Sequence, residues 1–220
     1  MDWDGHAERE EERYAEGLAR LPSDPDGRQK QLVRVAMAAT GAGLARLMQG
    51  RRAEAAGWLA RSAGRFRESY PDAPPGSWGR LLGAVKARLL AGDWDGADED
   101  ARWALGERPG DSESPIGRYA AVLALLVLGR DDEALSLATG LRAEAEPAFP
   151  EAVAAALAGL AAADAGLYRD AVRRVLLSFE ERDAYLEDIP VADTVVVLET
   201  LAARRGLAAG LASPLLPKSS

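Results

Sequence analysis

A short pattern built around glycine recurs four times along this chain and constrains its fold more than any other sequence feature. In each copy an alanine stands five residues after the glycine, and a small or branched apolar residue stands nine after it. Successive copies are separated by 42, 37 and 37 residues, a period typical of stacked helix pairs. The copies are Gly50 with Ala55, Gly92 with Ala97, Gly129 with Ala134, and Gly166 with Ala171. The pattern predicts an all-α fold of antiparallel hairpins stacked as a short superhelix, with about nine or ten helices.

Proline and glycine clusters divide the chain into three parts. Residues 1–27 are expected to form an acidic helix and linker, and residues 189–220 a capping helix followed by a docked tail. Between them, residues 28–188 are expected to hold the four hairpins. The hairpins are expected over residues 28–70, 77–108, 114–146 and 150–185. Each glycine is predicted to take a left-handed conformation at its bend, which a residue without a Cβ reaches most easily.

The second copy carries the most specific family signal. Residues 89–97 read Leu-Leu-Ala-Gly-Asp-Trp-Asp-Gly-Ala and are followed by Ala101, Ala104 and Pro109. This order resembles the second half of a tetratricopeptide repeat, in which an aromatic follows the glycine at two residues, alanines at five and twelve, and proline at seventeen. In the fourth copy, Tyr168 and Ala171 match the same pattern. The chain therefore resembles a divergent tetratricopeptide-like domain, which implies a concave groove that is lined by first helices and holds a peptide or partner helix.

Two of the expected first helices are unusual for an open groove. Residues 116–128 are apolar nearly all round, and residues 151–163 are mostly alanine. Helices that are apolar on every side are buried on every side. We therefore expect the groove to be filled by the N-terminal arm or the C-terminal tail, or covered by a second subunit in a homodimer. The apolar tail, residues 207–216, is expected to dock on the body, because a free tail would expose a sticky patch.

Charge is unevenly distributed along a chain whose net charge is −8. Residues 1–27 hold nine acidic and three basic residues, whereas residues 28–70 hold nine basic and two acidic ones. Either the two regions neutralise each other within the monomer, or the basic face meets an acidic partner. Nucleic-acid binding is unlikely for so acidic a chain.

The composition argues against several classes of function. The chain has no cysteine and a single histidine, His6, which excludes a zinc site and leaves serine and threonine without a histidine base. We expect no cofactor, no metal and no catalytic residue. No basic-then-apolar leader and no apolar stretch of about 20 residues is present. A cytoplasmic protein without membrane contact is the expectation.

Candidate partner-binding residues lie in two first helices or just before them, and around the end of the fourth hairpin. They are Trp78, Arg80, Arg88, Arg118, Tyr119, Asp183, Tyr185 and Asp188. Arg80 and Arg118 stand at corresponding points of successive repeats and could form a two-pronged anchor for a carboxylate. Alternatively, these two arginines pair within the chain with the acids of the last hairpin, namely Glu180, Asp183, Glu187 or Asp188.

The leading functional hypothesis is a non-enzymatic tetratricopeptide-like interaction protein that binds a protein or peptide, with a homodimer as one form that it could take. The alternative is a small acidic immunity or antitoxin-type inhibitor that blocks a toxin or enzyme. Its acidic face would be residues 179–188, where acids alternate with aromatics. Capture of a basic, nuclease-like protein would favour the inhibitor.

Overall fold

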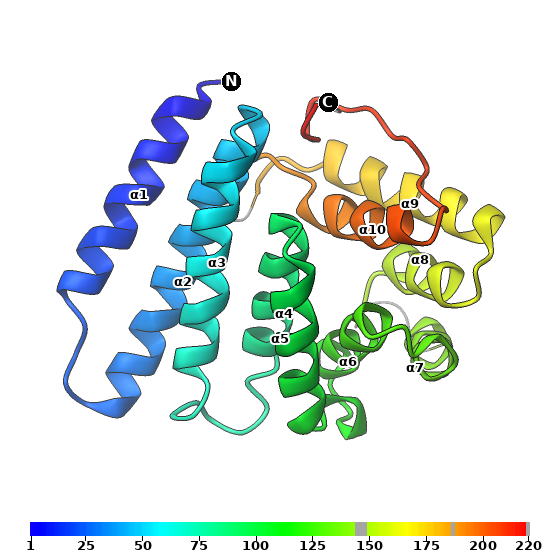
Figure 1. The fold of residues 1–220 in the computed structure, drawn as a ribbon, viewed down its shortest axis with the longest axis horizontal. Helices are drawn as coiled ribbons and strands as arrows, with labels where there is room; N and C mark the ends of the chain where they lie inside the picture. Colours follow the sequence, from blue (N-terminus) through cyan, green and yellow to red (C-terminus); the bar gives the residue numbers. More distant parts are fainter. Residues whose placement is uncertain (144–148, 186–187, 219–220) are drawn as a thin grey trace.

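The computed structural model describes residues 1–143, 149–185 and 188–218, and this part of the chain contains α-helices and one short 3-10 helix (Figure 1). The predicted all-α class and the expected number of helices are confirmed. In chain order the helices are α1 (Trp3–Ala19), α2 (Pro25–Met48), α3 (Arg52–Ser69), α4 (Gly79–Ala91), α5 (Trp94–Gly106), η1 (Pro109–Asp111), α6 (Pro115–Val127), α7 (Asp131–Ala143), α8 (Glu151–Ala161), α9 (Ala165–Glu180) and α10 (Asp193–Arg204).

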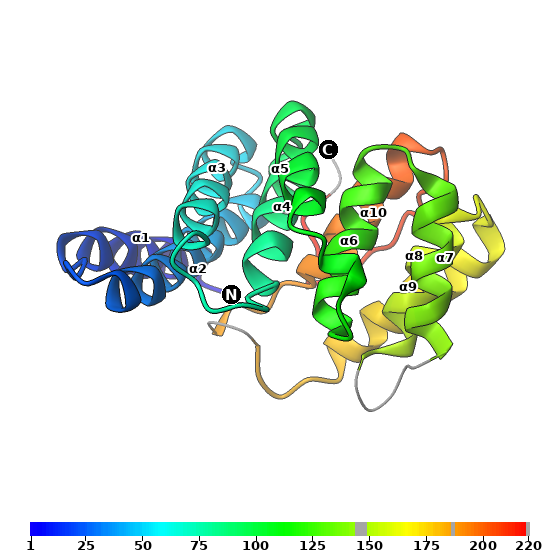
Figure 2. The ribbon, with the colours of Figure 1, turned by 90° about the horizontal axis from the view of Figure 1, so that it is seen from below.

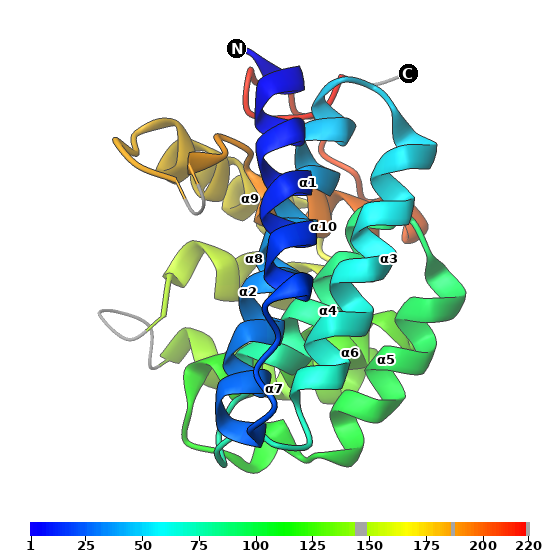
Figure 3. The ribbon, with the colours of Figure 1, turned by 90° about the vertical axis from the view of Figure 1, so that its left-hand side faces the viewer.

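Each helix from α1 to α9 packs against the next one in the chain. The pairs α2–α3, α4–α5, α6–α7 and α8–α9 form the four hairpins, and α1 lies against α2 at the N-terminal end of the row (Figure 3). Local signals agree with this arrangement, since Asp2, Asp24, Asp93, Ser114 and Asp164 cap the helices that follow them.

The bends confirm three of the four predicted glycines and correct the fourth. Gly50, Gly92 and Gly129 have positive φ values of 76°, 70° and 69°. In the fourth hairpin the left-handed residue is Ala163, at φ 51°. Gly166 lies inside α9 instead, where its N–H donates to the capping Asp164 carboxylate at 3.0 Å. The last bend-to-bend interval, from residue 129 to 163, is thus 34 residues, which is the tetratricopeptide period.

The shifted bend changes which residue separates the two helices of the fourth hairpin. Five residues after the bend, the first three hairpins have Ala55, Ala97 and Ala134, all fully buried. The fourth has Tyr168, which is also 0% exposed. Gly159 of α8 makes room for it, because a Cβ there would lie 2.7 Å from the Tyr168 backbone nitrogen. In this hairpin the large residue, Tyr168, is therefore on the second helix, and the small residue, Gly159, is on the first.

One chain is enough to bury the two unusually apolar helices. Helix α6 contacts α4, α5, α7, α8 and η1, while α8 contacts α6, α7, α9 and α10. Among the described residues, the large hydrophobic side chains that remain exposed are Met1, Ile116 and Leu177. The apolar character of α6 and α8 therefore gives no reason to require a second subunit.

The C-terminal segment, residues 188–218, folds back onto the stack and occupies part of the concave side. Figure 2 shows the chain after α9 crossing toward α2 before it returns as α10, which packs against α4, α8 and α9. Between α9 and α10, Ile189 lies against Gly41 of α2, where a Cβ would stand 2.7 Å from the Ile189 Cδ1. The groove is thus narrowed by the chain between α9 and α10 and by the start of α10, whereas residues 207–216, the tail expected to fill it, do not line it.

The apolar tail docks through backbone hydrogen bonds to α10. The Glu199 carboxylate accepts hydrogen bonds from the Ala209 and Gly210 N–H groups, both at 3.0 Å. The Ala192 N–H donates to the Leu215 carbonyl at 2.9 Å. Glu199 also accepts the Tyr168 hydroxyl at 2.5 Å, so that one carboxylate joins the tail, α10 and α9.

The acidic first helix and the basic first hairpin meet within the monomer. The Arg46 guanidinium of α2 donates to the Glu11 carboxylate of α1 at 2.7 Å and lies 3.8 Å from Asp4. Neutralisation inside the chain therefore accounts for at least this arginine. Within the described residues, no helix combines the length and the apolar composition that crossing a membrane requires.

Candidate ligand-binding cavity

A cavity of about 720 Å³ lies on the concave side of the stack, and we call it the concave cavity. Residues of the first helices α2, α4, α6 and α8 line the cavity. They are joined by residues of α9, of the start of α10, and of the segment between these two helices, described over residues 181–185 and 188–192, which we call the crossing. Its volume falls within the range of roughly 300–1,000 Å³ that is usual for small-molecule sites. The C-terminal segment therefore narrows the groove to a cavity of ligand size.

One face of α4 forms the centre of the lining. Gly79, Leu82, Gly83, Lys86 and Leu90 recur at three- and four-residue intervals, so they share one side of the helix. Gly83 lets the Phe66 ring of α3 lie directly against this helix, since a Cβ at residue 83 would be 2.7 Å from the ring. Close packing of α3 on α4 thus directs the larger side chains of α4 into the cavity.

A charged pair joins the two walls of the cavity. The Lys86 ammonium donates to the Asp193 carboxylate at 2.7 Å and to the Thr194 hydroxyl at 3.4 Å. The two charged side chains are 18% and 25% exposed. Burial alone would lower the pKa of Lys86 and raise that of Asp193, but their mutual attraction outweighs it in both cases. The pKa of Lys86 is therefore raised and that of Asp193 lowered, so both groups stay ionised at neutral pH.

Next to this pair is a buried phenol. Tyr119 is only 6% exposed and packs edge-on against Phe149, with ring centroids 5.3 Å apart. Burial raises the pKa of its hydroxyl, an effect that the nearby Lys86 charge opposes. Among the described residues, the hydroxyl has no partner at hydrogen-bond geometry. A buried donor without a partner is uncommon and costs free energy.

Two arginines complete the polar part of the lining. Arg80 donates to the Ser69 carbonyl at 2.9 Å and to the Gln29 side chain. Arg182 stacks over Phe179, 3.7 Å from the ring centroid, and donates to the Ser178 carbonyl at 3.2 Å. The described lining thus carries three basic side chains and one acidic one, Asp193. This excess of positive charge stands out in a chain of net charge −8.

Three of the eight residues predicted from the sequence line the concave cavity: Arg80, Tyr119 and Tyr185. Tyr185 donates its hydroxyl to the Phe179 carbonyl at 2.9 Å. Asp183 and Asp188 are exposed on the crossing that follows α9.

The other three predicted residues lie outside the cavity lining. Arg88 pairs with Asp93 at 2.7 Å and Asp100 at 2.9 Å inside the second hairpin. The Trp78 ring lies beside Gly117 at the start of α6, 3.0 Å from where a Cβ would stand. Arg118 donates to the Glu113 carbonyl at 3.2 Å.

Two roles were predicted for Arg80 and Arg118, an anchor for a carboxylate or ion pairs with the acids of the last hairpin. Only Arg80 reaches the cavity, so the expected two-pronged anchor of Arg80 and Arg118 is not formed there. Arg80 donates to the Gln29 side chain and the Ser69 carbonyl, while Glu180 accepts the Ser213 hydroxyl at 2.7 Å. Glu187, the remaining acid of the predicted clamp, lies outside the described residues.

Sequence reasoning missed Asp193, Thr194 and Arg182 as cavity residues. A carboxylate in the first turn of a helix has an ordinary explanation, since it complements the helix dipole. Asp193 lies 107 residues from Lys86 in the chain, so local spacing carries no sign of the pair. Only the return of α10 onto α4 brings the two together.

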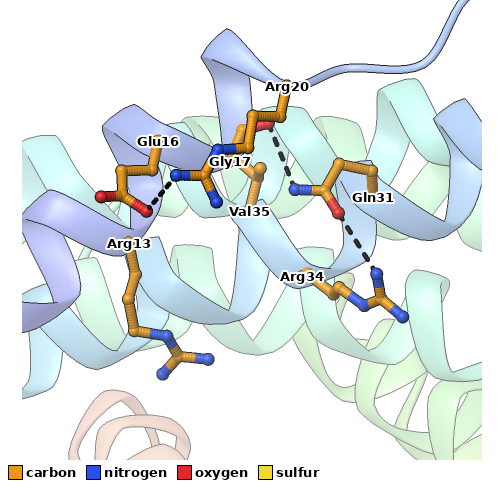
Figure 4. Close-up of a pocket in the computed structure, with 7 residues that line it drawn as sticks. All are labelled: Arg13, Glu16, Gly17, Arg20, Gln31, Arg34 and Val35. Carbon is orange, nitrogen blue, oxygen red and sulfur yellow. Dashed lines mark hydrogen bonds and ion pairs between the residues drawn. The ribbon is translucent and has the colours of Figure 1, made fainter.

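A second hollow lies where α1 crosses α2 and measures about 180 Å³ (Figure 4). Gly17 allows the close approach, because a Cβ there would be 2.7 Å from the Val35 side chain. Its polar groups bind one another, with Arg20 on Glu16 at 3.1 Å and the Gln31 amide on the Gly17 carbonyl at 3.2 Å. This hollow is explained by helix packing.

Comparison with known proteins adds no assignment, because no protein-family model, curated protein or solved structure matches the chain. Among the described residues, no group of three or more histidine, cysteine or acidic side chains is placed to hold a metal ion.

Proposed function

We propose that this chain is a non-enzymatic binding protein of the tetratricopeptide-like type, and that its ligand site is the concave cavity. The observation that carries the proposal is the lining itself. It combines apolar walls from four first helices with a small polar group around Lys86, Asp193 and Tyr119. Apolar walls with a few convergent polar groups are the usual composition of a ligand site.

The ionisation of the polar group supports binding rather than catalysis. A lysine whose pKa is raised holds its proton at neutral pH and is not a nucleophile. An aspartate whose pKa is lowered stays ionised and is a poor general acid or base. Neither group has the perturbation that an acid–base or covalent mechanism needs.

The crossing and α10 limit what the groove can admit. In the tetratricopeptide resemblance, a long partner helix would lie along the first helices, but here the C-terminal segment contacts α2, α4 and α8. We therefore propose that recognition of a protein or peptide partner uses the cavity or the outer surface. A cytoplasmic location and possible self-association belong to the same proposal.

Binding of an uncharged fluorescent dye, N-phenyl-naphthylamine, tests the proposed site. The parent protein should bind the dye at one site and enhance its fluorescence. Leu82→Trp should fill the cavity from α4 and weaken dye binding by about tenfold or more. Leu177→Trp is the matched control, because Leu177 is exposed and lies outside the lining.

Thermal melts of both variants keep the test interpretable. A Leu82→Trp protein that melts like the parent and binds the dye equally well would contradict the proposed site. If that variant proves unstable, Val33→Trp, which fills the cavity from α2 instead, decides the matter.

A further inference from the structure

The charge and hydrogen-bonding groups of the concave cavity restrict the chemistry of its ligand, and this inference rests on the function proposed above. We propose that the cavity binds a small amphipathic carboxylate, a molecule with an apolar hydrocarbon body whose carboxylate lies among Lys86, Tyr119 and Arg182.

Unused donors in one part of the lining define the position of the carboxylate. An ammonium has three N–H donors, and Asp193 and Thr194 accept two of those of Lys86. The Tyr119 hydroxyl, more than nine-tenths buried, interacts with the nearby Thr194 side chain, which acts to lower its pKa, and has no partner at full hydrogen-bond geometry among the described residues. Arg182, exposed just after α9, is a further basic side chain of the same lining. Three donors in one lining are what a carboxylate accepts.

The net positive charge of the lining argues against a ligand with a cationic head. Asp193 neutralises one of the three basic groups in the lining, which leaves two positive charges in excess. An anionic head is attracted by this excess, whereas a cationic head would add a further positive charge to a partly desolvated site.

The rest of the lining favours a hydrocarbon body over a peptide. Three hydroxyls of the lining already donate to backbone carbonyls, Ser77 to Pro74, Ser178 to Val175 and Thr40 to Ala36. The described lining contains no asparagine or glutamine. A peptide would bury amide groups without partners, which is costly, while a hydrocarbon chain has none to satisfy.

Calorimetric titration with three probes of equal chain length tests the proposal: decanoate and decyltrimethylammonium, each below its micelle concentration, and decanol below its solubility limit. We expect decanoate to bind at one site about tenfold more tightly than decanol. Decyltrimethylammonium should bind most weakly. Decanol binding that equals or exceeds decanoate binding would overturn the proposal.

Two variants locate the carboxylate. Arg182→Gln should weaken decanoate binding roughly three- to tenfold, and Tyr119→Phe should weaken it about threefold, with decanol binding unchanged in both. Arg61→Gln is the matched control, because Arg61 also stacks on an aromatic ring, 4.3 Å above Trp58, but lies outside the cavity. Equal effects of the Arg182 and Arg61 changes on decanoate would contradict the assignment.

The two proposals fail in different ways. If the uncharged dye binds and Leu82→Trp blocks it, but decanoate shows no advantage over decanol, the binding site stands and the carboxylate proposal falls. If a short peptide with an apolar C-terminus displaces the dye more effectively than decanoate does, the cavity serves a peptide partner and the hydrocarbon ligand is wrong. If neither dye nor decanoate binds, both proposals fall.

Discussion

The second and fourth hairpins solve the same packing problem with opposite residues. In α4–α5 the left-handed bend is Gly92, and the fully buried residue five positions later is Ala97. In α8–α9 the bend is Ala163, and the corresponding buried residue is Tyr168. The space that alanine leaves in one hairpin is provided in the other by Gly159 on the facing helix. The comparison teaches that a large residue at this position is accommodated by a glycine on the facing helix.

Both hairpins are also joined to α10, through different chemistry. Lys86 of α4 meets the start of α10 in an ion pair with Asp193 at 2.7 Å. Tyr168 of α9 meets its middle through the hydroxyl bond to Glu199 at 2.5 Å. Both hairpins therefore contact α10, the helix whose start lines the concave cavity.

The largest expected effect is at the residue that distinguishes the fourth hairpin. Tyr168→Ala should lower the free energy of unfolding by about 3–5 kcal/mol, because it leaves a cavity where an aromatic ring was fully buried. Ala97→Gly, at the same place in the second hairpin, should cost only about 1 kcal/mol through helix propensity. Urea unfolding measures both.

The Tyr168→Phe variant separates the ring from the hydroxyl. It should cost about 1–2 kcal/mol, since only the bond to Glu199 is lost and the packing stays. A Tyr168→Ala protein as stable as Tyr168→Phe would show that the exchange of large and small residues does not hold this hairpin together.

The ion pair between α4 and α10 comes next. Lys86→Met should cost about 2–3 kcal/mol, because it leaves the partly buried Asp193 without its cation. The double variant Lys86→Met with Asp193→Leu should recover most of this loss, since no unpaired charge remains. Thermal melts and urea unfolding of the single and double variants give the coupling free energy between Lys86 and Asp193. Additive losses would contradict a direct interaction.

The pH dependence of this pair follows from its two shifts. The pKa of Asp193 is lowered from its ordinary value of 3.8, so its contribution is present above that value and is lost as pH falls through the folded pKa. The pKa of Lys86 is raised from 10.5, so its contribution is lost as pH rises through the folded value. The stability difference between parent and double variant should be flat from about pH 5 to 9. A change within that window would contradict the assignment.

The smallest effects concern the bends and should have opposite signs. Gly92→Ala should destabilise by about 1 kcal/mol, because an alanine at φ 70° is strained although no atom crowds its Cβ. Ala163→Gly should stabilise by about 0.5–1 kcal/mol by relieving the same strain at φ 51°, less what glycine adds to unfolded-state entropy. Differential scanning calorimetry resolves shifts of this size, and changes of the same sign would undo the comparison.

Much of the fold could be predicted because its signals are local. Glycine bends, capping aspartates and apolar spacing lie within one hairpin, and they placed the helices to within a few residues. The fourth bend was wrong because Gly166 fits the pattern as well as a true bend does, and because an alanine in the left-handed region leaves no mark in the sequence. The exchange of Tyr168 with Gly159 becomes visible only when the two helices are seen together.

The site was harder to predict because it is made by contacts between distant parts of the chain. Arg80 and Tyr119 could be proposed from their repeat positions, and both line the cavity. Asp193 could not, since its role depends on α10 returning to α4. Arg88 shows the opposite case, because it was proposed as a cation near an aromatic, and in the structure it binds the acids of its own hairpin.

The contact between Ile189 and Gly41 has a consequence for the order of folding during synthesis. Residue 189 follows α1 to α9 in the chain, so these helices leave the ribosome before it does. The early hairpins can pair with their neighbours as they emerge, but the cavity gains its second wall only when the chain from Ile189 to Thr194 arrives. For that interval the apolar surface of α2 and α4 is open to water and to other chains. A ligand or chaperone present at that moment would meet a wider opening than the finished protein offers.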